Sequence, residues 1–190
     1  MAKKNKKLAF GLIEVMVASS MILMILMALT TATKAALQGN QLIHLRASAL
    51  FLAQEGLEIT RGIRDNNWSG NSGLAWKSLQ WSGNTLVDIS LTGDSCYKVE
   101  YNDAVKSFGL SPIISCPLIG ANEGELIEIE SDNPDTFYRY IKIGPVGDEL
   151  LLGSTEDNGE NALKMTVYVT YSDNKTVEIS EILTNWLPKY

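Results

Sequence analysis

The sequence has few of the residues that build metal sites and nucleophilic active sites. Its 190 residues include two cysteines and a single histidine, His44. A zinc site needs about four nitrogen, sulfur or oxygen ligands at close spacing, and a nucleophilic serine or cysteine usually needs a histidine beside it. The motifs GxSxG, HExxH and GxGxxG and the P-loop are also absent. We therefore predict no catalytic residues, no metal site, no cofactor and no enzyme activity.

Basic residues are scarce beyond the first few positions. The chain has 16 basic and 22 acidic side chains, a formal charge of −6. Four of the basic ones are Lys3, Lys4, Lys6 and Lys7, and without residues 1–9 the balance is 12 basic to 22 acidic, or −10. Surfaces that bind nucleic acid are usually rich in lysine and arginine. The body of the protein is acidic, so nucleic acid is not indicated as a partner.

Proline is absent before Pro112. Because proline kinks or ends a helix, its absence permits a long one, which we expect from Phe10 to about Arg64, about 80 Å at 1.5 Å per residue. Beyond Thr33 the apolar residues recur mostly three and four positions apart, which predicts one buried stripe. Polar residues at 65–67 end the helix. The stripe comprises Leu37, Leu42, Leu45, Ala49, Leu52, Ala53, Leu57 and Ile63.

A membrane-length apolar run follows the basic cluster. It extends from Leu12 to Leu29, and to about Ala36 if alanine, serine and threonine are counted. A helix needs about 20 apolar residues to span a bilayer, whereas a secretory signal peptide has about 7–15 before a small-residue cleavage site. No clear site of that kind follows here. Because basic flanks stay in the cytoplasm, we predict a single-pass protein with its N-terminus inside and its C-terminal body outside.

One carboxylate, Glu14, lies near the start of this apolar run. An acidic side chain at the centre of a membrane helix costs roughly 2.5–3.5 kcal/mol on insertion scales. A residue kept at such a cost is a candidate functional site.

The N-terminal stretch resembles the class III signal of type IV pilins and type II secretion pseudopilins. The resemblance lies in the lysine cluster, a small residue, Phe10, and then Leu-Ile-Glu-Val at 12–15. It implies that a prepilin peptidase cuts between Ala9 and Phe10, that the new Phe10 amine is methylated, and that Glu14 is the fifth mature residue. The chain departs from the family pattern at Ala9, where glycine is usual. A cut between Gly11 and Leu12 restores glycine but makes Glu14 the third mature residue.

The resemblance also implies a role for Glu14 in subunit assembly. Its carboxylate would pair with the Phe10 amine of a neighbouring subunit, and in apolar surroundings that pair is worth more than in water. The alternative is a hydrated or protonated carboxylate at the membrane interface. The implied partners are the prepilin peptidase, other pilin or pseudopilin subunits, lipid of the cytoplasmic membrane and the pilus assembly platform.

The second half of the chain alternates apolar and polar residues over short runs, which is typical of β-strands. Ser172-Asp173-Asn174 predicts a hairpin turn between the last two runs. A long helix followed by antiparallel strands gives an α+β fold, in which one sheet face packs on the helix stripe. Segment 52–68 is also similar to a segment of minor pilins, and the last hairpin resembles that of minor pilins and type II pseudopilins. The expected strands are residues 85–91, 96–101, 125–130, 137–143, 164–171 and 176–182.

We expect five segments along the chain. They are a leader peptide at 1–9, a membrane-spanning or filament-core helix at 10–32, an amphipathic half of the helix at 33–67, an irregular connector at 68–94 and an antiparallel β head at 95–190.

The remaining candidate sites leave alternatives open. If the head lies outside the cytoplasm, Cys96 and Cys116 form one disulfide in the simplest interpretation, and two free buried thiols are the alternative. Two acidic loops, 130–135 and 156–161, carry oxygen ligands of the kind Ca²⁺ takes, but neither has EF-hand spacing, and exposed acidic turns are the alternative. Trp68, Trp76 and Trp81 either pack the connector onto the head or form a carbohydrate-binding or adhesive surface.

The resemblance implies a structural subunit of a type IV pilus, a minor pilin that aids assembly or pilus function. The alternative in the same class is a type II secretion pseudopilin. The alternative in another class is a membrane-anchored binding module whose head lies outside the cytoplasm and whose helix is only an anchor.

Overall fold

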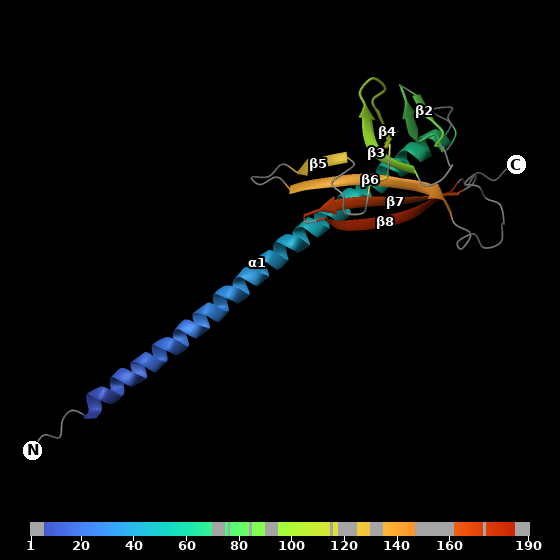
Figure 1. Ribbon diagram of the computed structural model, residues 1–190. Helices are drawn as coiled ribbons and strands as arrows, with labels where there is room; N and C mark the ends of the chain where they lie inside the picture. The colour runs from blue at the N-terminus through green and yellow to red at the C-terminus, as the bar shows by residue number, and fades with distance from the viewer. Residues whose placement is uncertain are drawn as a thin grey trace, which may run out of the picture. The chain divides into compact units, whose positions relative to one another are not determined.

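The computed structural model describes residues 6–69, 75, 77–83, 85–89, 95–114, 116–117, 125–129, 135–146, 162–172 and 174–184. The chain divides into two compact units, Met1–His44 and Leu45–Tyr190. A single helix of 63 residues, α1 (Lys6–Trp68), begins in the first unit and ends in the second (Figure 1). The long proline-free helix expected from the sequence is therefore confirmed.

Helix α1 ends at Trp68, one turn beyond the expected end near Arg64. The side chain of Asn67 is buried, and its amide donates a hydrogen bond to the carbonyl oxygen of Ser78 at 2.8 Å. A buried amide needs such a partner, and this one fixes the last turn of the helix. The polar residues at 65–67 predicted an earlier end, but the hydrogen bond of Asn67 to Ser78 extends the helix to Trp68.

The second unit holds one mixed sheet with the strand order β2-β1-β4-β3-β6-β7-β8, and β5 also pairs with β6. Among the strands that the structure describes, every pairing is antiparallel except a single parallel contact of β1 with β4. The expected α+β layout of a helix packed on a largely antiparallel sheet is present. The strands are β1 (Gln80–Ser82), β2 (Thr85–Val87), β3 (Ser95–Asn102), β4 (Ser107–Pro112), β5 (Glu125–Ile129), β6 (Asp135–Pro145), β7 (Ala162–Tyr171) and β8 (Lys175–Thr184).

Two strand predictions need correction. Within residues 85–89, the described part of the run expected at 85–91, only Thr85–Val87 form a strand. Strand β4 (Ser107–Pro112) was not predicted, because it contains Gly109 and ends in a proline, residues that are depleted in strands. It forms because the whole of β4 pairs with β3, from Asn102 opposite Ser107 to Tyr97 opposite Pro112.

The hairpin predicted at the end of the chain is confirmed. Strands β7 and β8 pair from Ala162 opposite Thr184 to Tyr171 opposite Lys175. At the turn Asn174 has φ = 61°, a left-handed conformation that asparagine tolerates better than most residues. The local turn chemistry therefore sets the register of β7 and β8.

The core of the second unit lies between one face of the sheet and the part of α1 beyond His44. From Ala49 onward the buried side chains of the helix recur three and four positions apart, as the predicted stripe requires. Leu37 and Leu42 were expected in that stripe but are 64% and 39% exposed. The helix residues buried in the core are Ala49, Ala53, Leu57, Thr60 and Ile63, with Leu45, Leu52 and Ile59 partly buried against it.

The helix approaches the sheet closely at Gly56. A Cβ added there would lie 3.2 Å from Cγ1 of Val167 and 3.4 Å from Cδ of Arg139. These two residues belong to β7 and β6, so both strands meet the helix at this point. Glycine is unfavourable inside an isolated helix. At this position its lack of a side chain leaves the space that Val167 and Arg139 occupy.

Two arginines tie the helix to the sheet. The buried guanidinium of Arg139 donates hydrogen bonds to the carbonyl oxygen of Leu52 at 3.0 Å and to the carboxylate of Glu55 at 3.1 Å. Arg61 bonds to the Glu181 carboxylate on β8 at 2.7 Å and to Glu58 at 2.7 Å. The hydrogen bond to Glu181 raises the pKa of Arg61 above its usual value, so the arginine stays charged.

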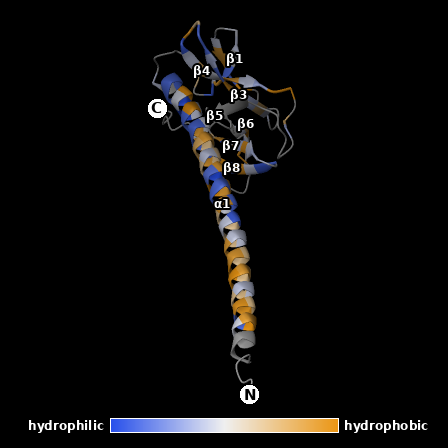
Figure 2. Ribbon diagram, turned by 90° about the vertical axis from the view of Figure 1, so that its left-hand side faces the viewer, coloured by the Kyte–Doolittle hydropathy of each residue, from blue (hydrophilic) through white to orange (hydrophobic). Residues whose placement is uncertain are grey.

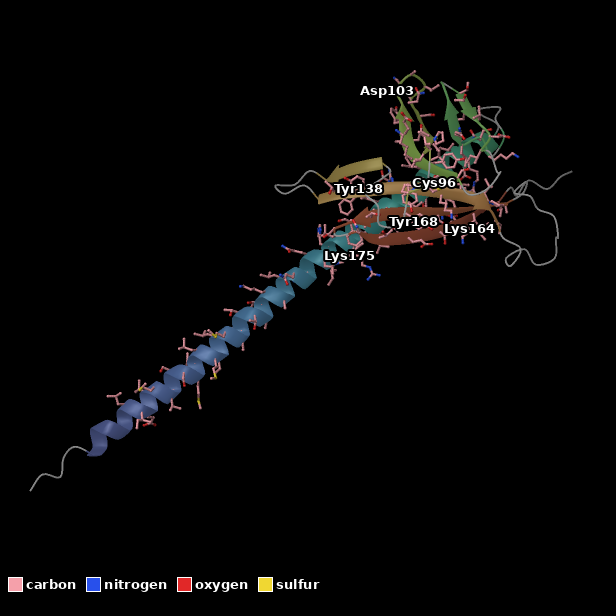
Figure 3. All side chains as sticks on the ribbon, viewed as in Figure 1. Cys96, Asp103, Tyr138, Lys164, Tyr168 and Lys175 are labelled. Atoms are coloured by element: carbon pink, nitrogen blue, oxygen red, sulfur yellow. A yellow bond between two sulfur atoms is a disulfide. The ribbon has the colours of Figure 1, made fainter. Side chains whose placement is uncertain are left out.

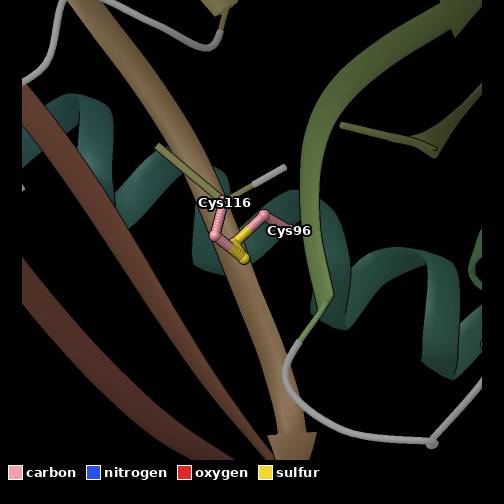
Figure 4. The surroundings of a disulfide bond; sticks show 2 residues. All are labelled: Cys96 and Cys116. Carbon is pink, nitrogen blue, oxygen red and sulfur yellow. A yellow bond between two sulfur atoms is a disulfide. The ribbon is translucent and has the colours of Figure 1, made fainter. Parts of the chain in front are cut away.

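Cys96 and Cys116 are joined by a disulfide bond (Figure 4). Cys96 is buried in β3, opposite Lys142 of β6, whereas Cys116 follows β4 in the chain and is exposed. The N–H of Ile113 also donates to the carbonyl oxygen of Cys96 at 2.8 Å. The disulfide therefore fastens the segment after β4 back onto the centre of the sheet.

Replacing Gly56 with leucine should destabilise the second unit, because the larger side chain would enter space held by Val167 and Arg139. We expect the free energy of unfolding to fall by about 1–3 kcal/mol. Urea denaturation of the full chain in detergent micelles, followed by near-UV circular dichroism, measures this. Gly62→Leu is the matched control, since a Cβ at Gly62 meets nothing within 4 Å. Equal destabilisation by both variants would contradict the assignment.

Removing the disulfide should also destabilise the second unit. The cysteines are 20 positions apart, and a closed loop of this length contributes about 3 kcal/mol through the entropy of the unfolded chain. We expect the double variant Cys96→Ala, Cys116→Ala to lose about that amount in urea denaturation. A reductant should bring the unmodified protein to the same stability and leave the double variant unchanged. A reductant effect in both proteins would show that the loss has another origin.

Candidate functional site

The N-terminal part of α1 presents apolar side chains with no covering from the described residues. From Gly11 to Leu29 every residue is exposed, as are Ile43 and Leu37 beyond. Figure 2 shows that most residues of this part of the helix are hydrophobic. The helix is long and apolar enough to span a membrane: its most apolar 18-residue window has a mean hydropathy of 2.4 and none of it is buried. The assignment as a membrane-length helix rests on length and composition, and a signal sequence near an N-terminus has the same two properties.

The hydroxyl groups of this segment are satisfied within the helix itself. Ser19 and Ser20 donate to carbonyl oxygens three residues back, at 2.9 and 2.8 Å. Thr30, Thr31 and Thr33 do the same at 2.9 Å each. A hydroxyl with no partner is costly in an apolar medium. The local bonds remove that cost, so these residues do not prevent the segment from entering a bilayer or an apolar helix assembly.

Glu14 is the only ionisable side chain between Gly11 and Thr33. It lies exposed on α1, and within the described residues its carboxylate forms no hydrogen bond or ion pair. In water that carboxylate is hydrated, whereas in an apolar setting it needs a cationic or donor partner from outside this chain. This combination makes the segment from Gly11 to Thr33, with Glu14 near its start, the candidate functional site.

The predicted cleavage residues lie next to this site along the chain. Ala9 and Phe10 belong to α1, which begins at Lys6. Phe10 precedes Glu14 by four residues, which is about one helical turn, or 6 Å along the axis. A cut between Ala9 and Phe10 would place a new amine one turn before the carboxylate.

Several other sequence candidates find no support in the described residues. His44 is exposed on α1. Loop 156–161 and Trp76 lie outside the described residues, as does loop 130–135 apart from its last residue, Asp135, which begins β6. Trp68 ends α1 and Trp81 lies in β1. Within the part of the chain that the structure describes, no three metal-ligating side chains come together.

Comparisons with family models, with curated proteins and with solved structures find no match to this chain. The function is therefore proposed from the sequence and the structure of the chain itself.

A single cation in the middle of the apolar segment should impair its entry into a membrane. Met24 is 73% exposed near the centre of the segment, and an arginine at a helix centre costs about 2.5–3.5 kcal/mol on insertion scales. We expect Met24→Arg to lower the fraction of protein that resists alkaline extraction from membranes. Phe51→Arg is the control, because Phe51 is 70% exposed on the same helix but lies beyond the apolar run. If both variants stay in the membrane like the unmodified chain, the segment is not a membrane anchor.

Proposed function

We propose that the chain is a pilin-like structural subunit of a type IV pilus, most similar in layout to a minor pilin. In this proposal a prepilin peptidase cuts between Ala9 and Phe10, the Phe10 amine is methylated, and the mature helix passes from the cytoplasmic membrane into the filament. The N-terminus faces the cytoplasm before processing, and the head lies outside. The protein acts by assembly with other subunits and catalyses no reaction.

The observation that carries this proposal is an apolar helix surface that no described residue covers, marked by one acid. The segment from Leu12 to Leu29 is exposed on all sides. A helix that served only as an anchor would gain nothing from Glu14 and would lose stability in lipid by carrying it. A helix that leaves the membrane to pack against copies of itself has a use for the carboxylate, which can pair with a neighbour's amine.

The head supports the same proposal. The part of α1 beyond His44 is packed on the sheet through Gly56 and tied to it by Arg139 and Arg61. The head is thus built onto the C-terminal half of the helix whose N-terminal half is apolar. The disulfide between Cys96 and Cys116 suits a head in an oxidising compartment.

Glu14→Ala is the direct test of assembly. We expect the variant to reach the membrane and to be processed, but to be absent from filaments sheared off the cells, because the neighbour's amine loses its partner. Glu58→Ala is the control, since it removes a carboxylate from the same helix outside the apolar segment. Immunoblots of sheared and cell-bound fractions measure the outcome. Normal incorporation of the Glu14 variant would rule out the assembly role.

The intact mass of the mature protein separates the two cleavage registers and tests processing itself. A cut between Ala9 and Phe10 leaves methylated Phe10 at the start, whereas a cut after Gly11 gives a chain shorter by two residues. A membrane-anchored binding module would keep its full length whether or not the prepilin peptidase is present. A type II secretion pseudopilin would be processed, and its loss would abolish export of secreted enzymes rather than surface piliation.

A further inference from the structure

An apolar groove lies between the last turns of α1 and the strands β2 and β4. Its volume is about 310 Å³. A Cβ added at Gly62 would meet nothing within 4 Å, so the groove is open above this glycine. Ile63 belongs both to the buried core and to the lining, so the core of the second unit reaches the surface here. The lining includes Ile59, Gly62, Ile63 and Asn66 of α1, Leu86 of β2 and Phe108 of β4.

Exposed hydrophobic side chains continue from the groove onto the β3–β4 hairpin. The rings of Phe108 and Tyr101 pack edge to face with centroids 5.0 Å apart, and both side chains are exposed. Val105, in the turn between the two strands, is exposed as well. Exposed apolar patches that continue beyond a single side chain usually mark contacts with another macromolecule. The groove and the hairpin together therefore favour a protein partner over a small molecule.

One edge of α1 carries a protruding aromatic side chain. Phe51 is 70% exposed, although this part of the helix packs on the sheet. Ser48, three residues earlier, and Glu55, four residues later, lie on the same edge, because residues three and four positions apart share a helix face. These three residues are called here the knob edge. Its aromatic ring is available to fill a cavity in another molecule.

The helix side of the groove repeats the spacing of the knob edge. Ile59, Gly62 and Asn66 are again three and four residues apart. Each lies 11 residues after its counterpart in the knob edge, which is about three helical turns, or about 16 Å along the axis. The knob edge and the groove therefore lie on nearly the same side of α1, one further along the helix than the other.

The knob edge and the groove are complementary in shape. When one copy is shifted by 11 residues along a parallel second copy, Phe51 of the first lies opposite Gly62 of the second. The ring then enters the groove at the residue that has no side chain. The small side chain of Ser48 lies opposite the larger side chain of Ile59. Burial of the phenylalanine ring is the main favourable contribution of this contact.

The polar groups of the two surfaces are complementary as well. The same shift places Glu55, whose side chain is 55% exposed, opposite Asn66. The amide of Asn66 can donate a hydrogen bond to that carboxylate. A cation also borders the groove: Lys106 directly precedes β4, whose first residue lines it, and Lys106 is exposed and forms no ion pair among the described residues. Figure 3 labels Asp103, which belongs to the same turn. An acidic knob edge thus meets a groove bordered by an amide and an ammonium group.

We propose that the groove receives Phe51 from a second copy of this chain, shifted by about 16 Å toward the C-terminal end of the helix. Each copy then offers its knob edge to one neighbour and its groove to another. Because of the axial shift, this head-to-tail contact does not close into a ring and extends into a filament. A lipid tail in the groove would leave Asn66 and Lys106 without an acceptor, and a basic peptide would be repelled by Lys106.

This inference rests on the proposed function, because the shift requires helices that have left the bilayer. Copies anchored by the same apolar segment lie at the same depth in a membrane. A relative shift of about 16 Å would draw about 11 residues of one segment out of the hydrocarbon. We therefore expect the contact in filaments and not among copies that are still in the membrane.

Photocrosslinking of the full chain in sheared filaments tests the contact. With p-benzoylphenylalanine in place of Phe51, irradiation should give a covalent dimer on reducing gels. Peptide mass spectrometry should place the new bond within residues 59–66 or 107–108 of the other copy. Arg46 is the control position, because it is exposed and lies about 140° around the helix from Phe51. The same probe at Arg46 should form no bond to the groove.

Substitutions in and beside the groove identify what holds the contact. Gly62→Leu fills the groove from a position where a Cβ meets nothing within 4 Å. We expect it to lower the yield of dimer at least about tenfold, because the Phe51 ring is no longer buried. Lys106→Glu should lower the yield about threefold, because Glu55 then faces a like charge. Lys98→Glu is the matched control and should leave the yield unchanged, since Lys98 is an exposed lysine of β3 outside the groove lining. Near-UV circular dichroism verifies that each variant is folded.

Failure of the contact and failure of the proposed function give different results. If the chain is present in filaments but the probe at Phe51 forms no bond to the groove, or bonds only to a different subunit, the contact is wrong and the pilin function stands. Equal yields of dimer with and without Gly62→Leu would also overturn the contact, as would equal yields from membranes and from filaments. If the chain is absent from filaments, the function and the contact both fail.

Discussion

The apolar surface of α1 between Leu12 and Leu29 must be removed from water by something other than the described chain. Nothing in the described residues covers it. Burial of apolar surface is the dominant favourable term in folding and association, and a run of this length cannot stay exposed in a stable aqueous protein. The helix is long and apolar enough for a lipid bilayer to take up this surface.

The sheet covers only one side of the helix, and only in the part of the helix beyond His44. A close approach requires small residues, and the buried stripe supplies Ala49, Ala53 and Gly56 at the sheet. Arg139 then bonds a helix carbonyl oxygen, and Arg61 joins the helix to β8. These polar contacts hold the helix against the sheet without covering its exposed side, which stays available along its length.

Much of this arrangement could be predicted from the sequence, because its signals are local. The absence of proline predicts the long helix, the spacing of Ala49, Ala53 and Leu57 predicts the buried stripe, and Ser172 to Asn174 predict the hairpin turn. Strand β4 could not be predicted, because Gly109 and Pro112 disfavour a strand and only the pairing with β3 overrides that preference. Leu37 and Leu42 fit the helical period but are exposed, since period alone does not show where the covering sheet begins.

A cavity of about 150 Å³ on the sheet face turned away from the helix illustrates a further limit of sequence reasoning. Lys142, Lys164 and Glu178 look like the ordinary solvent-facing residues of three strands, and strand alternation alone predicts only that they point away from the helix. The register of β6, β7 and β8 brings them around Thr166, and register depends on pairing between residues far apart in the chain, such as Lys142 and Thr166, which are 24 positions apart. The same register that buries one face against the helix therefore creates a charged, aromatic cavity on the other. Because α1 packs on one face of β6 and β7, only the opposite face of these strands is turned away from the helix.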